Sequence, residues 1–511
     1  MLQGEGDKIL CIHIRSPFPN IMDINSRKFL ATLISCSILL VGCTGESDQG
    51  AEDISAQEEL EGTADIEIIP ETLEIEGSEF CDDTNQIHCM LPFPSGAFLS
   101  EDSSQDTGFR LSIDGEAIPD SRSSVSDNMV ILDRLDGFSP STQIFTAFEK
   151  VPNITGLATQ FDIEKSLMDD HRSVLLNMDT GEKVFHWIEV DARAQEGEET
   201  LLFLRTIEGL DHDTSYAVGF RGLLDSAGHQ INPHEGFRAL RDNISTSSVG
   251  IEEQREHYEE MFSSLDSSGF ERASLQAAWW FHTASTDSIL RDIVIMRDDA
   301  ENRLGQSGIG CNITEVTENY GNDGNTLRLI RGTFTTPHYM ENEYARSPLM
   351  RGESGDPQFV ENREVDFSML IPRSLADNNT SGPLTVFGHG LFGSGSSYVR
   401  NAGSIANEYQ TVVIATDFKG WSSDGDQDAM TFALLDLKEF QYQQERQMQA
   451  VINHISMVRT ITGICSDLVE FKNNGTNMID VETVNYIGIS LGGLRGPSLL
   501  AFVPELEWGC L

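Results

Sequence analysis

Residues 484–492 read VNYIGISLG, so that a short apolar run leads directly into a Gly-x-Ser-x-Gly motif. Ser490 is the serine of this motif, and Gly488 and Gly492 stand two residues before and after it. A serine on a sharp turn between a strand and a helix projects its Oγ above the sheet, and the glycines keep side chains from colliding there. The stretch therefore predicts a nucleophilic serine, with the Leu491 N–H facing a developing oxyanion.

A second glycine-rich segment follows another short apolar run. The run LTVF at 384–387 is followed by GHGLFG at 388–393, which resembles the oxyanion-hole loop after the third strand of α/β hydrolases. The resemblance implies that the backbone N–H groups of His389, Gly390 and Leu391 are the donors. His389 has a competing interpretation as a general base, but we expect it to position the loop.

The pattern after about residue 326 predicts a doubly wound, mostly parallel sheet. Short continuous apolar runs such as Val412–Ala415 are typical of buried parallel strands. A long helical stretch at about 428–460 separates these runs from the strand that precedes the serine motif. Alternation of strands and helices is the pattern of an α/β fold. Two antiparallel strands, 327–334 and 365–372, are expected to lead into the parallel ones.

The residues before about 326 divide into segments that differ in composition. Short β signals separated by turn residues predict an immunoglobulin-like β-sandwich, in which the Tyr216 hydroxyl ties the corner LDHDTSYAVGF to the backbone. The expected segments are an over-extended start at 1–21, a signal peptide at 22–42, an acidic flexible tether at 43–77, the sandwich at 78–245, a helical connecting region at 246–325, and the truncated hydrolase domain at 326–511.

The N-terminal region has the pattern of an export signal. Arg27 and Lys28 precede a short apolar run that ends in LVGC at 40–43. This arrangement predicts a secretory signal peptide. Its last four residues resemble a bacterial lipobox, which implies a diacylglycerol group on the Cys43 thiol. Buried acyl chains hold a protein on a membrane durably, and Thr44 resembles the residue found in lipoproteins sent to the outer membrane. We therefore expect an exported, lipid-anchored protein of the bacterial cell envelope.

The charge of the chain argues against nucleic-acid binding, and the spacing of its cysteines favours a disulfide over a metal site. The chain has 82 Asp and Glu against 34 Lys and Arg, for a net charge of -48, and such a surface repels nucleic-acid phosphates. Cys81 and Cys89 lie eight residues apart, and an oxidising compartment would favour a disulfide between them. A metal site that includes His88 lacks a second ligand pair at zinc spacing. No metal or cofactor is expected, because acyl transfer by an activated serine needs neither.

The lipobox, the segment CMLPFPS at 89–95, the sandwich corner and the two glycine-rich motifs occur in this order. Together they resemble bacterial lipoproteins of the virulence-factor lipase type, a β-sandwich followed by an α/β-hydrolase domain. The resemblance implies a membrane-anchored serine hydrolase that cleaves carboxylic esters, as an esterase, lipase or lysophospholipase. A peptidase or polyester depolymerase on the same fold is one alternative. A non-enzymatic surface-binding lipoprotein with a vestigial hydrolase fold is another.

The chain departs from the hydrolase pattern after Ser490. In this fold an acidic residue and then a histidine follow the nucleophile along the chain. Only Glu505 and Glu507 follow Ser490 here, and no histidine does. We therefore expect a C-terminally truncated chain that lacks its catalytic acid and histidine and is inactive as given.

Overall fold

The computed structural model describes residues 11–13, 72–78, 80–114, 117, 134–195, 198–423, 427–436 and 439–511. The predicted signal peptide, Cys43 and most of the predicted tether lie outside these residues. Among the helices that are described, none is both long and apolar enough to cross a membrane.

The N-terminal part contains two three-stranded antiparallel sheets. One sheet consists of β6 (Ser173–Asn177), β9 (Ser215–Arg221) and β11 (Leu275–His282), and the other of β5 (Ile144–Phe148), β8 (Thr200–Thr206) and β7 (His186–Val190). Apolar side chains of both sheets contribute to one continuous core. The Asp211 N–H donates to the Tyr216 hydroxyl at 2.9 Å, which is the predicted tie between the corner and the backbone. The immunoglobulin-like topology itself stays a prediction.

Smaller elements border these sheets. They are the hairpin of β3 (Leu99–Glu101) and β4 (Phe109–Leu111), the parallel pair of β2 (Thr72–Leu73) and β10 (Ser245–Thr246), and the helix α2 (Glu235–Arg241).

The predicted helical connecting region at 246–325 is only partly helical. It contains α3 (Val249–Ser267) and α4 (Thr286–Leu304), but β11 lies between them and joins the N-terminal sheet. All eight residues of β11 are buried, and a short apolar run of this kind is equally compatible with a strand or a buried helix. After α4, β12 (Cys311–Glu318) already belongs to the C-terminal sheet.

The C-terminal sheet has eight strands in the order β1-β20-β19-β15-β16-β14-β13-β12. Their bounds are β1 (Cys11–His13), β20 (Trp508–Cys510), β19 (Ile479–Gly488), β15 (Gly382–Gly388), β16 (Val412–Ala415), β14 (Glu361–Pro372) and β13 (Thr326–His338). Only β20, β19, β15 and β16 run parallel, and the remaining pairs are antiparallel. The described sheet is therefore mixed, and the prediction of a mostly parallel sheet was wrong, because the long β13–β14 ladder and the edge strand β12 extend its antiparallel half.

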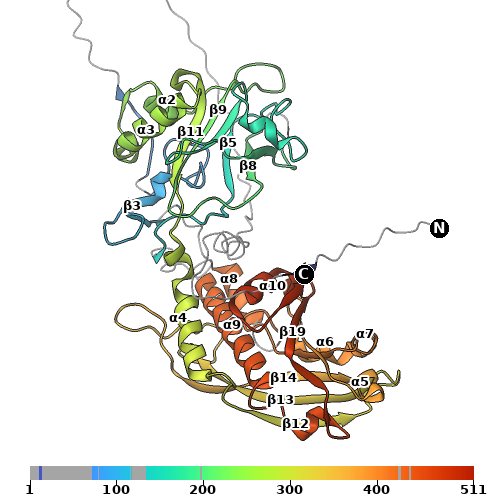
Figure 1. Cartoon of the computed structure of the whole chain (residues 1–511). Helices are drawn as coiled ribbons and strands as arrows, with labels where there is room; N and C mark the ends of the chain where they lie inside the picture. Colours follow the sequence, from blue (N-terminus) through green and yellow to red (C-terminus); the bar gives the residue numbers. More distant parts are fainter. Residues whose placement is uncertain are drawn as a thin grey trace, which may run out of the picture.

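Helices cover both faces of this sheet, as a doubly wound fold requires (Figure 1). On one face lie α4, α9 (Phe440–Thr462) and α10 (Leu491–Phe502), and on the other lie α6 (Gly395–Asn401) and α7 (Gly403–Tyr409). The short helix α5 (Arg373–Asn378) follows β14 and places Leu375 in the core on the first of these faces. The predicted helix at 428–460 consists of two helices, α8 (Gln427–Leu435) and α9. A short hairpin of β17 (Lys472–Asn473) and β18 (Thr476–Asn477) precedes β19.

Two disulfides join cysteines that are far from the described chain ends, and Cys510 is disulfide-bonded as well. Cys81 is bonded to Cys89, the pair favoured by the sequence. Cys311 is bonded to Cys465 across 154 residues, which ties the edge strand β12 to the segment that follows α9. The sequence did not indicate this second pairing, because only the fold brings the two cysteines together.

Candidate active site

Ser490 lies between the last residue of β19 and the first residue of α10. Its φ of 56° and ψ of -117° are unusual for a residue with a side chain, and such a conformation persists only where the surrounding structure enforces it. Ser490 is exposed, whereas Leu491, the next residue, is buried. The strained turn therefore presents the serine hydroxyl to solvent at the carboxyl end of the strand.

The glycines of the motif are required by close packing. A Cβ on Gly488 would overlap the backbone of Gly492, and a Cβ on Gly492 would overlap the carbonyl group of Gly388 at the end of β15. The Tyr486 hydroxyl donates to the Gly492 carbonyl at 2.5 Å and holds the first turn of α10 against the sheet. The turn that carries Ser490 is thus packed directly against the start of the second glycine-rich motif.

The structure brings the two glycine-rich motifs together. Gly388 and Gly488 are register partners at the ends of the parallel strands β15 and β19, and the Ile489 N–H donates to the Gly388 carbonyl at 3.2 Å. A Cβ on Gly390 would lie 3.7 Å from the Cβ of Ser490. The first backbone N–H groups of a helix have no partner within the helix, so that of Leu491 is available at the N-terminus of α10. Both proposed sources of oxyanion donors therefore border the serine.

His389 is buried and both of its ring nitrogens have partners. Nε2 lies 2.8 Å from the backbone nitrogen of Phe418, and Nδ1 lies 2.8 Å from the carbonyl oxygen of Gly390. Because the Phe418 N–H can only donate, Nε2 accepts and Nδ1 carries the proton that it donates to Gly390. This geometry gives His389 no free nitrogen for proton transfer and supports the positioning role.

Tyr398 on α6 is a residue of the site that the sequence analysis missed. Its ring stacks on Phe387 with the centroids 5.3 Å apart. A Cβ on Gly390 would lie 2.9 Å from the Tyr398 hydroxyl, and a Cβ on Gly393 would lie 2.9 Å from its ring. Tyr398 therefore packs against the glycine-rich loop, and its hydroxyl lies on the side of Gly390 that faces Ser490. The signal in the sequence that could have indicated this role is an aromatic residue shortly after the glycine-rich loop.

No side chain of the described residues hydrogen-bonds the Ser490 hydroxyl, so the catalytic base and acid are not identified among them. Glu505 is ion-paired with Arg459 at 2.7 Å. The Asp417 carboxylate accepts from the Gly395 N–H at 2.6 Å, as a group that caps the start of α6 does. Within the same described ranges, no group of three or more His, Cys, Asp or Glu residues has a metal-binding arrangement.

No protein-family model matches the chain, and no curated protein matches it. Among solved structures, it is similar to a putative acetyl xylan esterase from Bacteroides fragilis, with 12% identity and a TM-score of 0.25 over 42% of this chain and 50% of that one. It is also similar to LipA, a rice cell wall degrading esterase from Xanthomonas oryzae, with 15% identity and a TM-score of 0.18 over 38% of this chain and 45% of that one. The chain spans about half the length of these structures. Both neighbours are esterases, but at these TM-scores the function of this chain must be inferred from the site itself.

Proposed function

We propose that this chain carries the nucleophile and oxyanion hole of a serine hydrolase that cleaves carboxylic esters. The observation that supports this most is the strained, exposed Ser490 beside Gly390, where an added Cβ would lie 3.7 Å from the Ser490 Cβ. In the reaction, Oγ bonds to the ester carbonyl carbon, and a base takes the hydroxyl proton. The N–H groups of Leu491 and the loop at 389–391 hold the oxyanion. The alcohol leaves with a proton, and water then hydrolyses the acyl-enzyme.

The experiment must supply the base, because no imidazole hydrogen-bonds Ser490 within the described part of the chain. Ser490 is exposed, so imidazole from solution can reach its hydroxyl. We expect the protein to hydrolyse p-nitrophenyl butyrate only when imidazole is added, at a rate above that of the Ser490→Ala variant under the same conditions. Mass spectrometry should find the butyryl group on the peptide that contains Ser490. Equal rates for the two proteins would contradict the proposal.

The surroundings of the serine support an apolar acyl group. Leu391, Ile489 and Leu494 are exposed large apolar side chains in the two motifs and the first turn of α10. Esters of fatty acids, including lipids and lysophospholipids, are therefore the proposed substrates. In the imidazole assay, we expect p-nitrophenyl octanoate to be cleaved faster than the acetate. Cleavage of a peptide p-nitroanilide in preference to both would favour the peptidase alternative.

Membrane anchoring through Cys43 and a location in the bacterial envelope are part of the same proposal. The disulfides Cys81–Cys89 and Cys311–Cys465 support an oxidising compartment. Expressed in a Gram-negative host with radiolabelled palmitate, the chain should incorporate the label, and Cys43→Ser should not. Labelling that persists in the variant would rule out this anchor. A labelled protein without any Ser490-dependent reactivity would favour the non-enzymatic surface lipoprotein.

A further inference from the structure

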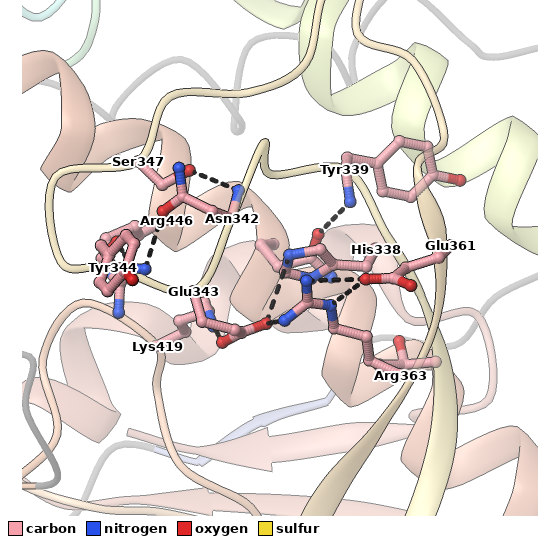
Figure 2. A network of polar contacts seen from close by, with 12 residues as sticks. His338, Tyr339, Asn342, Glu343, Tyr344, Ser347, Glu361, Arg363, Lys419 and Arg446 are labelled. Atoms are coloured by element: carbon pink, nitrogen blue, oxygen red, sulfur yellow. Dashed lines mark hydrogen bonds and ion pairs between the residues drawn. The ribbon is translucent and has the colours of Figure 1, made fainter.

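A second polar site lies at the end of β13, apart from Ser490. It is a cavity of about 620 Å³, which is within the usual size range of small-molecule sites. We call it the polar cavity, and its lining residues are His338, Glu343, Glu361, Asn362, Arg363, Glu364, Val365, Lys419 and Asn453. Figure 2 shows how the charged groups around it converge from β13, β14 and two loops.

The polar cavity opens at the same edge of the sheet as Ser490. His338 is the last residue of β13, which is antiparallel to β14, and β14 is antiparallel to β16. The ends of β13 and β16 therefore lie at one edge, together with the ends of β15 and β19. Lys419, in the loop after β16, directly follows Phe418, whose N–H donates to His389. One short loop thus borders both the glycine-rich motif and the polar cavity.

The charged groups of the polar cavity already neutralise one another. Glu343 is ion-paired with Lys419 at 2.9 Å and with Arg363, and Arg363 is also paired with Glu361 at 2.7 Å. The two cations face three glutamates, so the lining offers no excess positive charge for an anion. Val365 is the one apolar residue among those that line the cavity, so a fatty acyl chain would find little apolar surface.

His338 provides a polar atom without a hydrogen bond. Its side chain is 3% exposed, and its Nε2 lies 3.4 Å from a Glu343 oxygen without the geometry of a hydrogen bond. Burial lowers the pKa of His338 to about 4. The imidazole is therefore neutral at physiological pH. A buried polar atom of this kind normally has a partner, and His338 is one of the residues that line the cavity.

We propose that the polar cavity binds an uncharged, hydroxyl-rich ligand, a saccharide, one of whose hydroxyl groups hydrogen-bonds His338 Nε2. A hydroxyl group both donates and accepts, which suits a lining that alternates cationic donors with carboxylate acceptors. Lys419 and Arg363 donate to ring oxygens or hydroxyls, and Glu361 accepts from a hydroxyl at the rim. The site is independent of the acyl chemistry of Ser490, so its occupancy is measured without turnover.

Binding is tested by calorimetry on the full chain. The probes are glucose, xylose, galactose, N-acetylglucosamine and their β-linked disaccharides, with inorganic phosphate as the anionic comparison. At least one saccharide should bind with a millimolar or lower Kd, and phosphate should bind more weakly than that saccharide. His338→Phe, which removes the acceptor in a ring of similar size, should weaken saccharide binding by about tenfold.

A variant at the rim of the cavity tests the proposal independently, in case His338→Phe does not fold. Glu361 is 54% exposed, and Glu318, on β12 and outside the cavity, is 52% exposed. Glu361→Ala should weaken saccharide binding, and the matched control Glu318→Ala should not. Absence of binding to every saccharide, tighter binding of phosphate, or equal affinity of the Glu361 and Glu318 variants would each overturn the proposal. None of these results depends on whether Ser490 is reactive.

Discussion

The Nε2 of His389 accepts a hydrogen bond from the backbone N–H of Phe418 at 2.8 Å. This bond joins the glycine-rich loop after β15 to the loop after β16. The Phe418 ring packs on the same imidazole, with the centroids 5.0 Å apart, and stacks on His454 of α9. The position of the glycine-rich loop beside Ser490 is therefore fixed by contacts to the loop after β16 and, through Phe418, to α9.

Replacing His389 tests this anchoring. His389→Leu leaves the Phe418 N–H unpaired in a buried setting, and we expect the free energy of unfolding to fall by about 1–3 kcal/mol. His389→Gln offers an acceptor near the position of Nε2 and should recover part of the loss. Urea unfolding followed by circular dichroism measures both. Equal stabilities for the leucine and glutamine variants would show that the hydrogen bond contributes little.

Substitutions of Gly390 and Tyr398 should have non-additive effects on the rate at which Ser490 is acylated. In Gly390→Ala the new methyl group lies 2.9 Å from the Tyr398 hydroxyl and 3.7 Å from the Ser490 Cβ, so the loop must shift away from the nucleophile. We expect slower imidazole-dependent acylation of Ser490 in this variant. Tyr398→Phe removes the oxygen that the methyl group meets, so the double variant should react faster than Gly390→Ala alone. Additive effects would show that the two residues do not meet.

Gly492 should tolerate no side chain, whereas its neighbour should. A Cβ on Gly492 would overlap the Gly388 carbonyl group. This group belongs to the backbone of β15, an interior strand of the sheet, and cannot rotate aside as a flexible side chain can. The nearest atom to a Cβ on Gly493 is 3.3 Å away. We expect Gly492→Ala to lower the free energy of unfolding by about 3 kcal/mol and Gly493→Ala to have a much smaller effect. Thermal unfolding of both variants measures the two losses of stability, and a larger loss for Gly493→Ala would contradict this prediction.

The two disulfides should differ in their contribution to stability. Cys311–Cys465 closes a loop with a sequence separation of 154, and Cys81–Cys89 one of 8. If loop closure in the unfolded chain dominates, losing the first costs about 5 kcal/mol and losing the second about 2.5 kcal/mol. Paired serine variants of each disulfide, unfolded in urea, measure the two values. A larger loss for the Cys81–Cys89 variant would mean that local packing outweighs chain entropy.

The parts of the fold that sequence could predict are those encoded by short contiguous signals. The run at 412–415 coincides with β16, and the runs at 384–387 and 484–487 lie within the longer strands β15 and β19, because a buried parallel strand needs continuous apolar side chains. The place of Ser490 between strand and helix follows from the same local pattern. The Tyr216 hydroxyl bond was predictable for a similar reason, since it spans only five residues.

The missed features depend on residues far apart in the chain. The strand β11 pairs with β9, about 60 residues earlier, and its short, mostly apolar sequence does not distinguish a strand from a buried helix. Tyr398 reaches Gly390 only because α6 folds back over the loop. His338, at the end of β13, and Lys419, after β16, line one cavity because only β14 separates these two strands, and no spacing in the sequence indicates that arrangement. Such relationships are set by strand order, which a single sequence does not specify.

A buried carboxyl group in the N-terminal part should make stability depend on pH. Asp82 is buried beside the Cys81–Cys89 disulfide and accepts hydrogen bonds from the Thr84 N–H at 2.9 Å and from the Ser95 hydroxyl. Burial is the largest influence on this group, and it raises the pKa of Asp82 from 3.8 to about 6. The folded state therefore holds this proton more tightly than the unfolded chain does.

The direction of the pH effect follows from that raised pKa. The contribution of Asp82 is fully present below about pH 4 and is lost as the pH rises through about 6. Asp82→Asn stays neutral throughout, so wild type should lose about 3 kcal/mol relative to this variant between pH 4 and pH 8. Comparing the two proteins by urea unfolding at each pH cancels the effects of the other titrating groups. Asp298→Asn, at an exposed carboxylate, is the control and should show no such difference. A gap between wild type and Asp82→Asn that does not change with pH would mean that the Asp82 carboxyl group titrates normally in the folded protein.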